Sequence, residues 1–353
     1  MSKILKVAII GAGTISKRHL EGYKAIPGVT LAAVCDLNEE RAWELAREFG
    51  AEKACADYHE VLNDPAIDAV SIVTPTFTHG KIVNEALAAG KHVLCEKPPA
   101  LTYEEALQNE EAAKKSGKVL MYGFVVRFMD SSKYLKQYIE DGRMGEIYYA
   151  EASRMSNSSE IGGWFRDKTK SGGGMLMDAA IHQLDLLLWL MGYPKVKSVK
   201  GFISNVNKDL PERIRGTRSS YLSADNKPIP RTIESFSTGY ITFEDGKNLV
   251  IKAAHIANTP NTGTRYELLG DKSGVYSEGS TLKFRTIDEA NFFADFQPMI
   301  AESGKHFNAE IKHFVDCCHG DAQCIPNASE GAQIIRILNA IYESAETGRE
   351  ILF

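Results

Sequence analysis

A lysine directly after a run of apolar residues is the first candidate for chemistry in this sequence. Residues 92–95 are typical of a buried parallel strand, and Glu96-Lys97-Pro98 follows at its end. The carboxyl ends of such strands form the ligand crevice of an open α/β sheet. An ammonium group placed there can reach a bound ligand, and burial makes its pKa easy to shift. Taken alone, the motif is equally compatible with a lysine that caps a strand in solvent.

An aspartate and a histidine mark a second chemical region. The Ser-Gly-Gly-Gly segment at residues 171–174 precedes an apolar helix that we expect to run to Met191. Asp178 and His182 are four residues apart, which predicts that they share one helix face, and Asp185 lies a turn further on. A neutral histidine can accept a hydroxyl proton near pH 7, and a nearby carboxylate tunes it. A pair that only holds the start of the helix is the alternative.

A glycine-rich turn at residues 11–16, Gly-Ala-Gly-Thr-Ile-Ser, follows one predicted strand and opens a predicted helix. Gly11 permits the tight turn, and Gly13 lets the backbone approach a pyrophosphate that sits on the helix N-terminus. The alternative is a turn that only packs, but the strand before it and the helix after it favour a dinucleotide. We expect cofactor contacts from Gly11, Gly13, Thr14, Ile15 and Ser16, the last at the third glycine position of the fingerprint.

Asp36 ends the second predicted strand, 23 residues after Gly13. An acidic side chain at this place hydrogen-bonds the ribose hydroxyls and repels a 2′-phosphate. Leu37 and Asn38 follow it, so no basic residue stands ready for that phosphate. The sequence therefore favours NAD over NADP.

A further turn, at the end of the predicted strand 69–73, contains Thr74, Pro75, Thr76 and His79. It reaches the same crevice, where these groups can line the nicotinamide or its ribose. A turn combined with a helix cap is the alternative, since Thr and Pro serve both.

The order of predicted elements indicates two domains. Strands and helices alternate in the first part, which predicts a doubly wound parallel sheet. Its strands are expected at 6–10, 30–35, 69–73, 92–95 and 119–122, and its helices at 15–25, 39–49, up to 89, and 103–116. Later strands at 147–153, 236–243, 248–255, 266–269 and 282–285, with helices at 133–141, 310–318 and 329–347, indicate an open, mostly antiparallel sheet. We place the domains at 1–125 and 126–353, with the final helix able to pack back on the first.

Composition narrows the function classes. The chain has 353 residues, which is long for one core, and its net charge of −5 argues against nucleic acid as a partner. No apolar run is long enough to span a bilayer, and the start, Met1-Ser2-Lys3-Ile4, does not resemble a secretory signal. Six sparse cysteines suit reduced thiols. These features favour a cytoplasmic protein.

Two other segments leave questions open. His313, Cys317, Cys318, His319 and Cys324 cluster in sequence, but their spacing matches no standard zinc pattern, so we expect no metal. Residues 205–232 are polar, rich in arginine and proline, and carry a net charge of +3. Long loops in domains are usually functional or disordered, and a substrate loop, a subunit arm and a solvent loop all remain possible here.

Read together, Gly11-x-Gly13, Asp36, the Gly-Lys-His-Val-Leu-Cys-Glu-Lys-Pro stretch at 90–98 and Asp178-x-x-x-His182 resemble one family. It is the glucose–fructose oxidoreductase, inositol dehydrogenase and rhizopine-catabolism (Gfo/Idh/MocA) family, and the resemblance covers essentially the whole chain. It implies an N-terminal Rossmann domain and a C-terminal α/β domain with an open sheet, whose outer face commonly forms subunit contacts. We therefore expect a homo-oligomer: a dimer, tetramer or hexamer.

The resemblance also implies roles for single residues. His182 would be the general base, Asp178 would pair with it or hold the substrate, and Lys97 would hydrogen-bond the reacting hydroxyl and the nicotinamide region. Asp185 would bind a neighbouring hydroxyl, and the Lys97–Pro98 bond would be cis. Further cofactor contacts are assigned to Glu96, Arg127 and Trp164, and further substrate contacts to Arg154 and Arg166.

Family members mostly oxidise or reduce a ring carbon of sugars and cyclitols with a nicotinamide cofactor. The resemblance thus implies oxidation of a secondary ring alcohol to a ketone. The 205–232 insertion argues against a plain inositol dehydrogenase and fits a larger glycoside, or a sugar acid whose carboxylate meets an arginine. We favour a glucoside or sugar, with C3 as the candidate carbon. A NAD-dependent glycosidase or lyase and a non-catalytic NAD-binding sensor are the alternatives. The presence of Lys97, Asp178 and His182 together argues against the sensor.

Overall fold

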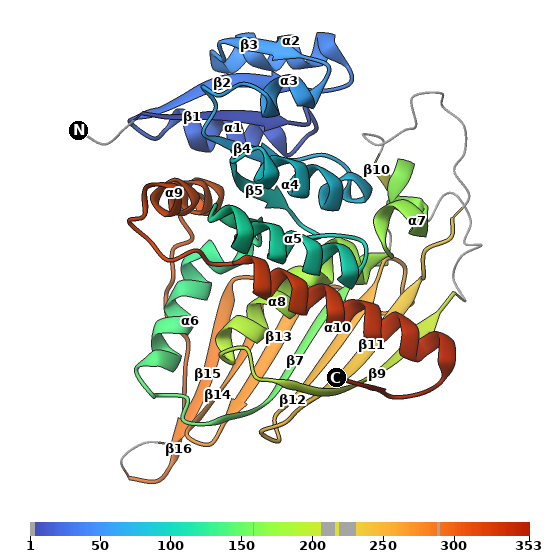
Figure 1. Cartoon of the computed structure of the whole chain (residues 1–353). Helices are drawn as coiled ribbons and strands as arrows, with labels where there is room; N and C mark the ends of the chain where they lie inside the picture. The colour runs from blue at the N-terminus through green and yellow to red at the C-terminus, as the bar shows by residue number, and fades with distance from the viewer. Residues whose placement is uncertain (1–3, 158, 206–215, 219–230, 288–289) are drawn as a thin grey trace. The chain divides into compact units, whose positions relative to one another are not determined.

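A computed structural model describes the chain except for residues 1–3, 158, 206–215, 219–230 and 288–289. The described chain divides into two units (Figure 1). The first comprises Met1–Phe128 and Lys305–Ile335, and the second comprises Met129–Gly304 and Arg336–Phe353. Whether residues 1–125 form an independent domain stays a prediction.

The first unit contains a six-stranded parallel sheet in the order β3-β2-β1-β4-β5-β6. This order, with its reversal between β1 and β4, is that of a dinucleotide-binding Rossmann fold. Its strands are β1 (Leu5–Ile10), β2 (Val29–Cys35), β3 (Lys53–Cys55), β4 (Ala69–Ile72), β5 (His92–Glu96) and β6 (Leu120–Gly123). Its helices are α1 (Ser16–Lys24), α2 (Glu39–Phe49), α3 (Tyr58–Leu62), α4 (His79–Ala88), α5 (Tyr103–Ser116) and α9 (His306–His319), with short 3₁₀ turns η1 (Thr76–Thr78) and η2 (Val125–Phe128).

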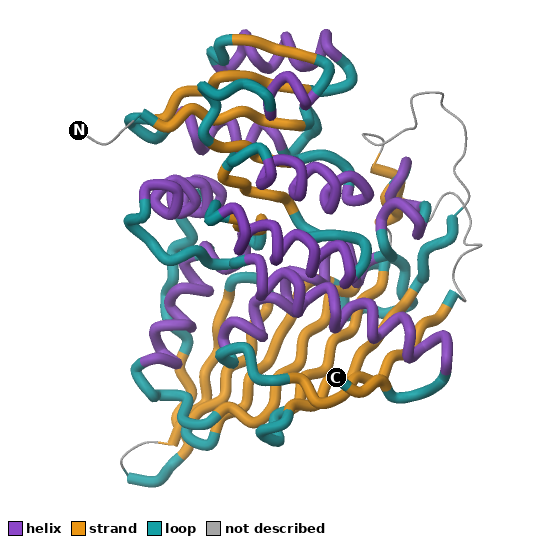
Figure 2. The backbone as a smooth tube through the Cα atoms, in the orientation of Figure 1, coloured by secondary structure: helices purple, strands orange, loops and turns teal. Residues whose placement is uncertain are grey.

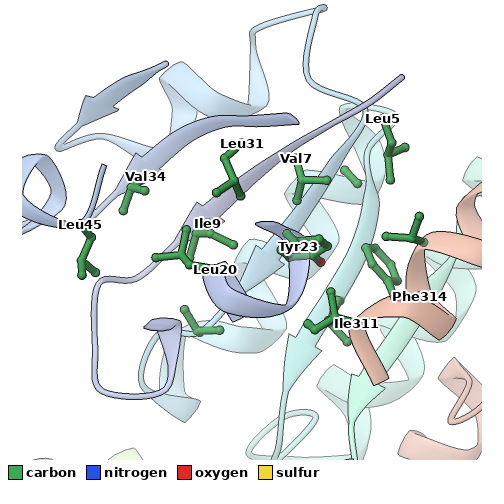
Figure 3. Packing of buried hydrophobic residues seen from close by; sticks show 14 of the residues in the cluster. Leu5, Val7, Ile9, Leu20, Tyr23, Leu31, Val34, Leu45, Ile311 and Phe314 are labelled. Carbon is green, nitrogen blue, oxygen red and sulfur yellow. The ribbon is translucent and has the colours of Figure 1, made fainter. Parts of the chain in front are cut away.

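The core of this unit lies between the sheet and its helices. Figure 3 shows Ile9 and Val34 of the sheet, Leu20 of α1 and Phe314 of α9 within one buried cluster. A Cβ atom on Gly22 would lie 2.8 Å from the Ile311 side chain, so this glycine lets α1 and α9 approach closely. The late segment that contains α9 is therefore an integral part of the first unit.

The second unit is built on a nine-stranded sheet in the order β16-β15-β14-β13-β7-β12-β11-β9-β17 (Figure 2). Neighbouring strands are antiparallel except β12 and β7, which are parallel. The strands are β7 (Ile147–Met155), β9 (Val196–Ser204), β11 (Phe236–Phe243), β12 (Asn248–Ala254), β13 (Gly263–Gly270), β14 (Ser273–Glu278), β15 (Thr281–Ile287), β16 (Phe293–Phe296) and β17 (Ile351–Leu352). Two short strands, β8 (Ser159–Ile161) and β10 (Gly216–Arg218), pair separately.

Helices cover one face of this sheet. They include α6 (Asp130–Glu140), α8 (Ile181–Leu190) and the second half of α10 (Ala328–Thr347), with a π-helical turn η4 (Leu176–Ala180) (Figure 1). The short helix α7 (Lys168–Ser171) and the 3₁₀ turn η3 (Gly163–Arg166) also belong to this unit. A Cβ atom on Gly201 of β9 would lie 2.0 Å from the Ile341 carbonyl oxygen of α10, and Gly239 of β11 meets the same residue. These two glycines allow the long helix to lie directly on the strands.

The predicted fold class is confirmed: a Rossmann unit is followed by a unit with a mostly antiparallel sheet. The chief difference concerns the apolar helix after residue 174. We expected one regular helix, but residues 176–180 form a π-helical turn before α8 begins. Among the described residues, no helix is long and apolar enough to cross a membrane.

Candidate active site

The glycine-rich turn joins β1 to α1 and packs against the end of β4. Gly11 has a φ of +107°, and a Cβ atom there would lie 2.7 Å from the Val73 carbonyl oxygen, so the fold itself requires this glycine. A Cβ atom on Gly13 would meet only that oxygen, at 4.0 Å. The protein's own packing therefore does not require a glycine at position 13, and the backbone there is open to close approach by a ligand.

The N-terminus of α1 suits an anion. Its N-cap residue, Ile15, makes no side-chain capping hydrogen bond, and the first turn contains no acidic residue. Ser16 is buried and donates a hydrogen bond from Oγ to the Gly13 carbonyl oxygen at 2.5 Å, while Gly13, Thr14 and Ile15 all reach the surface. The turn thus fits the pyrophosphate of a dinucleotide.

Asp36 holds the same turn from the end of β2. One carboxylate oxygen accepts a hydrogen bond from the Ala12 N–H at 2.6 Å, and the other accepts one from the Asn38 N–H at 2.9 Å. A carboxylate has further lone pairs to offer, so these bonds fix its direction and leave acceptor capacity for ribose hydroxyls. Asp36 is half-buried.

His79 lies between two turns. Its ring nitrogens lie 2.8 Å from the carbonyl oxygens of Thr74 and Pro98, and the side chain is only 1% exposed. Burial lowers the pKa of His79, despite the opposing effect of the two carbonyls. His79 thus links the turn after β4 to the turn after β5, and its contact with the cofactor stays a prediction. Thr76 is buried, while Thr74 and Pro75 are half-exposed.

Lys97 follows β5 in an otherwise buried stretch. Of residues 93–100, Lys97 alone is not classed as buried, and the Lys97–Pro98 bond is cis as expected. The Lys97 backbone N–H donates to Glu96 Oε2 at 3.1 Å. Since Glu96 is 8% exposed and also contacts His19 through Oε1, its side chain is engaged inside the protein.

Arg127, expected near the cofactor, is buried and donates a hydrogen bond from Nη1 to Glu330 Oε2 at 3.1 Å. The same Glu330 oxygen accepts the Asn327 N–H at 2.9 Å. This ion pair ties η2 to the start of α10, a role that the sequence did not reveal because the partners lie 203 positions apart.

Asp178 lies in the π-helical turn η4 of the second unit, and His182 is the second residue of α8. Because a π turn has more residues than an α turn, the argument from α-helical spacing does not hold here. Both side chains are half-exposed, although most of their neighbours in this apolar segment are buried. Pairing between Asp178 and His182 stays a prediction.

Two residues that the sequence did not single out hold the start of this segment. Both Glu234 carboxylate oxygens accept the Gly174 N–H, at 3.0 and 2.9 Å, and the Tyr342 hydroxyl donates to Glu234 at 3.0 Å. A Cβ atom on Gly173 would lie 1.9 Å from the Tyr342 hydroxyl oxygen. The glycines therefore make room for these two buried side chains. Burial, and then the Glu234 charge, raise the pKa of Tyr342 well above its usual value.

The remaining predicted residues of the second unit differ in exposure. Asp185 is 0% exposed and accepts a hydrogen bond from the Tyr193 hydroxyl at 3.2 Å, so its exposure does not favour contact with a substrate. Trp164 stacks on Phe165 with ring centroids 3.8 Å apart, and both are half-exposed, as is Arg166. Arg154 donates a hydrogen bond to Thr264 across two strands.

Other sequence features lie away from these residues. A hollow of about 770 Å³ over β13 to β16, lined by Tyr276 and Phe293 among others, includes none of the predicted site residues.

Cys317 lies 3.5 Å from His313 and is hydrogen-bonded to Cys324, which lowers the pKa of Cys317. The described residues contain no group of three or more acidic, histidine or cysteine side chains arranged to hold a metal. Most of the 205–232 segment lies outside the described residues.

Together these features indicate a dinucleotide-dependent oxidoreductase. They are a Rossmann sheet, a glycine turn that a pyrophosphate can approach and a lysine at the end of β5. Comparison with known proteins agrees with this class. Residues 5–124 match the sequence profile of an oxidoreductase family with an NAD-binding Rossmann fold, and residues 136–352 match the C-terminal alpha/beta domain of the same family. The chain therefore belongs to the Gfo/Idh/MocA oxidoreductase family.

Several relatives are similar over nearly their full lengths. D-glucoside 3-dehydrogenase of Escherichia coli is 32% identical, covering 99% of this chain and 98% of the relative. The NAD⁺-dependent scyllo-inositol 2-dehydrogenase of Bacillus subtilis is 30% identical, covering 90% and 87%. Among solved structures, levoglucosan dehydrogenase in complex with NADH superposes with a TM-score of 0.86 at 25% identity, covering 99% and 98%.

Proposed function

We propose that this protein oxidises a secondary ring hydroxyl of a sugar, glycoside or cyclitol to a ketone, with NAD as hydride acceptor. The observation that carries the proposal is the exposure pattern around Lys97. One lysine reaches the surface from a buried run at the carboxyl end of β5, where a Rossmann fold binds its ligands. The names of the similar relatives support the same reaction class.

The chain supplies the acid–base chemistry in this proposal. His182 takes the proton of the hydroxyl group, and Asp178 tunes the imidazole or holds the substrate. Lys97 hydrogen-bonds the same oxygen and stabilises the negative charge that develops on it. The nicotinamide, when bound, supplies the hydride acceptor. Gly13, together with the N-terminus of α1, would hold its pyrophosphate.

We propose NAD rather than NADP as the preferred cofactor. The support is Asp36, whose carboxylate is directed by the Ala12 and Asn38 backbone groups at the end of β2. An anionic side chain there accepts ribose hydroxyls and repels a 2′-phosphate.

We propose a glucoside or related sugar as substrate, with C3 as the oxidised carbon. Similarity over nearly the whole chain to a protein named D-glucoside 3-dehydrogenase supports this choice, as does the insertion at 205–232. A half-exposed stacked pair, Trp164 and Phe165, offers an apolar surface suited to a sugar ring.

The test is absorbance at 340 nm for purified protein with NAD⁺ and a panel of methyl and aryl glucosides, free hexoses, hexuronates and inositols. We expect NADH to accumulate most rapidly with glucosides, and NMR of the product to show a 3-keto sugar. A flat trace together with cleaved glycoside would indicate the glycosidase or lyase reaction. A flat trace with unchanged sugars across the panel would contradict the proposal.

We also propose that the outer face of the nine-stranded sheet mediates self-association and that the protein is cytoplasmic. On that face Tyr240 is exposed beside Lys200 of β9, and Phe202 of the same strand is exposed as well. All six cysteines are free thiols, which suits a reducing compartment. Light scattering after size-exclusion chromatography should give a dimer, tetramer or hexamer, and Tyr240→Lys should shift it toward smaller species.

A further inference from the structure

A chain of buried polar side chains runs beneath the Glu-Lys-Pro turn. The Tyr23 hydroxyl lies 2.7 Å from Ser71 Oγ, Ser71 Oγ lies 3.2 Å from His19 Nδ1, and His19 Nε2 lies 3.1 Å from Glu96 Oε1. Tyr23 and His19 come from α1, Ser71 from β4 and Glu96 from β5. This series of hydrogen bonds therefore connects α1 to β5, the strand that precedes Lys97. Figure 3 shows Tyr23 within the surrounding apolar core.

These polar groups occupy positions where apolar side chains would pack at lower cost. His19 and Ser71 are 0% exposed, and Glu96 is nearly as buried. Polar groups in such surroundings are expensive unless each finds a hydrogen-bond partner. Gly123, on the neighbouring strand β6, also makes room for the carboxylate, because a Cβ atom there would lie 3.0 Å from Glu96 Cδ. The local sequence is therefore arranged to keep a carboxylate at this position.

This series of hydrogen bonds ends at the backbone of Lys97. Glu96 Oε1 contacts His19, while Glu96 Oε2 accepts the Lys97 N–H at 3.1 Å. His19 lies one turn after Ser16, at the N-terminus of the helix that we propose receives the cofactor. The hydrogen bonds thus fix the Lys97 backbone to α1 rather than only to its own strand.

We propose that His19 and Glu96 are positioning residues for the reaction. They hold the Lys97 main chain so that its side chain meets the substrate oxygen in the required geometry. This inference rests on the proposed function of Lys97. Because small misplacements of a catalytic group cost up to about 100-fold in rate, loss of the Glu96 carboxylate should lower kcat by about 10–100-fold.

The test is a double-variant cycle of Glu96→Ala with Lys97→Met. The kcat is measured from steady-state NADH formation at 340 nm with methyl β-D-glucoside, and the NAD⁺ dissociation constant is measured separately by calorimetry. If Glu96 acts only through Lys97, replacing Glu96 should have no further effect on the rate once the lysine side chain is absent. We expect Glu96→Ala to cost about 10–100-fold in kcat with lysine present and less than twofold without it, with the NAD⁺ dissociation constant changed less than threefold.

Two further variants separate positioning from general stability. Asp68 is the matched control, since its carboxylate accepts the Lys6 backbone N–H at 3.0 Å at the opposite end of the same sheet. Asp68→Ala should lower the melting temperature but change kcat less than twofold. Glu96→Gln keeps an acceptor for the Lys97 N–H, so it should recover most of the rate that Glu96→Ala loses.

The outcomes distinguish this inference from the proposed function. If Lys97→Met retains its kcat, the assigned role of lysine is wrong and the inference fails with it. If Lys97→Met loses activity and Glu96→Ala costs the same factor in both backgrounds, the lysine assignment stands and the positioning role is wrong. An equal loss of kcat in Asp68→Ala would also overturn the positioning role.

Discussion

Two turns lie next to the proposed acid–base residues: one contains Lys97, and the other, at Gly174, precedes the helical segment that contains His182. A buried carboxylate accepts a backbone N–H in each turn. In the first unit Glu96 accepts the N–H of Lys97, its neighbour in sequence. In the second unit Glu234 accepts the N–H of Gly174, 60 positions away, and is itself held by Tyr342. The Glu96–Lys97 bond joins neighbours in sequence, and long-range contacts reach Lys97 only through Glu96, whose other oxygen contacts His19 of α1. The Glu234–Gly174 bond joins distant segments directly, so we infer that the second turn depends directly on long-range packing.

The largest expected effect tests the proposed catalytic role of the Lys97 side chain. Lys97→Met should lower kcat by about 10²–10⁴-fold, because it removes a group that acts on the reacting oxygen. Its matched control is Lys91, a buried lysine of the same unit whose Nζ donates to the carbonyl oxygens of Asp64 and Ile67. Lys91→Met should instead cost about 1–3 kcal/mol of unfolding free energy with little change in kcat. Steady-state kinetics and denaturant unfolding measure both. Equal losses of kcat would contradict the assignment.

The next effect concerns the long-range support of the second turn. Glu234→Ala leaves the Gly174 N–H and the Tyr342 hydroxyl without their buried acceptor, which should cost about 2–4 kcal/mol of unfolding free energy. Glu244 is the control, since it forms an exposed ion pair with Lys195. Glu244→Ala should change stability by less than about 0.5 kcal/mol. Urea unfolding of both variants shows whether the buried Glu234 carboxylate contributes more to the unfolding free energy than the exposed Glu244 carboxylate. Equal losses would contradict this prediction.

A smaller effect tests cofactor binding by the glycine turn. Gly11→Ala should destabilise the protein without ligand, because its φ is +107° and its Cβ would clash with the Val73 carbonyl. Gly13→Ala meets no such clash, so its melting temperature should match that of the parent protein. Its dissociation constant for NAD⁺ should nevertheless rise at least tenfold, or about 1.4 kcal/mol. If both glycines behave alike in both measurements, Gly13 has no special relation to the cofactor.

The smallest effect is a loss of stability at high pH. Burial raises the pKa of Tyr23 in the first unit and of Tyr342 in the second. Because each folded-state pKa lies above the unfolded value near 10, their contribution to stability is complete below about pH 10 and is lost as the pH rises further. The melting temperature should therefore fall above pH 10. Tyr23→Phe and Tyr342→Phe should each make that fall less steep, and an unchanged slope would show that neither tyrosine causes it.

The comparison also explains which parts the sequence could predict. Strand and helix periodicity, the glycine turn, Asp36 and the Glu-Lys-Pro motif are local patterns, and the structure places them at the expected ends of strands. Glu234, Tyr342 and the Arg127–Glu330 pair act over 108 to 203 positions, and no local signal marks them. The π turn at Asp178 was missed because apolar spacing does not distinguish it from an α-helix. The position of His79 between two backbone carbonyl oxygens could not be predicted, because a turn motif does not reveal which groups face a side chain.

The most direct test of the central claim is a double-variant cycle on the two proposed acid–base residues. NADH formation in a single turnover is measured at 340 nm for Lys97→Met, His182→Ala and the double variant, with the best sugar of the panel. If both side chains act on the same hydroxyl, the double variant should be about as slow as the slower single variant. Losses that multiply, or a His182→Ala variant with an intact kcat, would contradict the account.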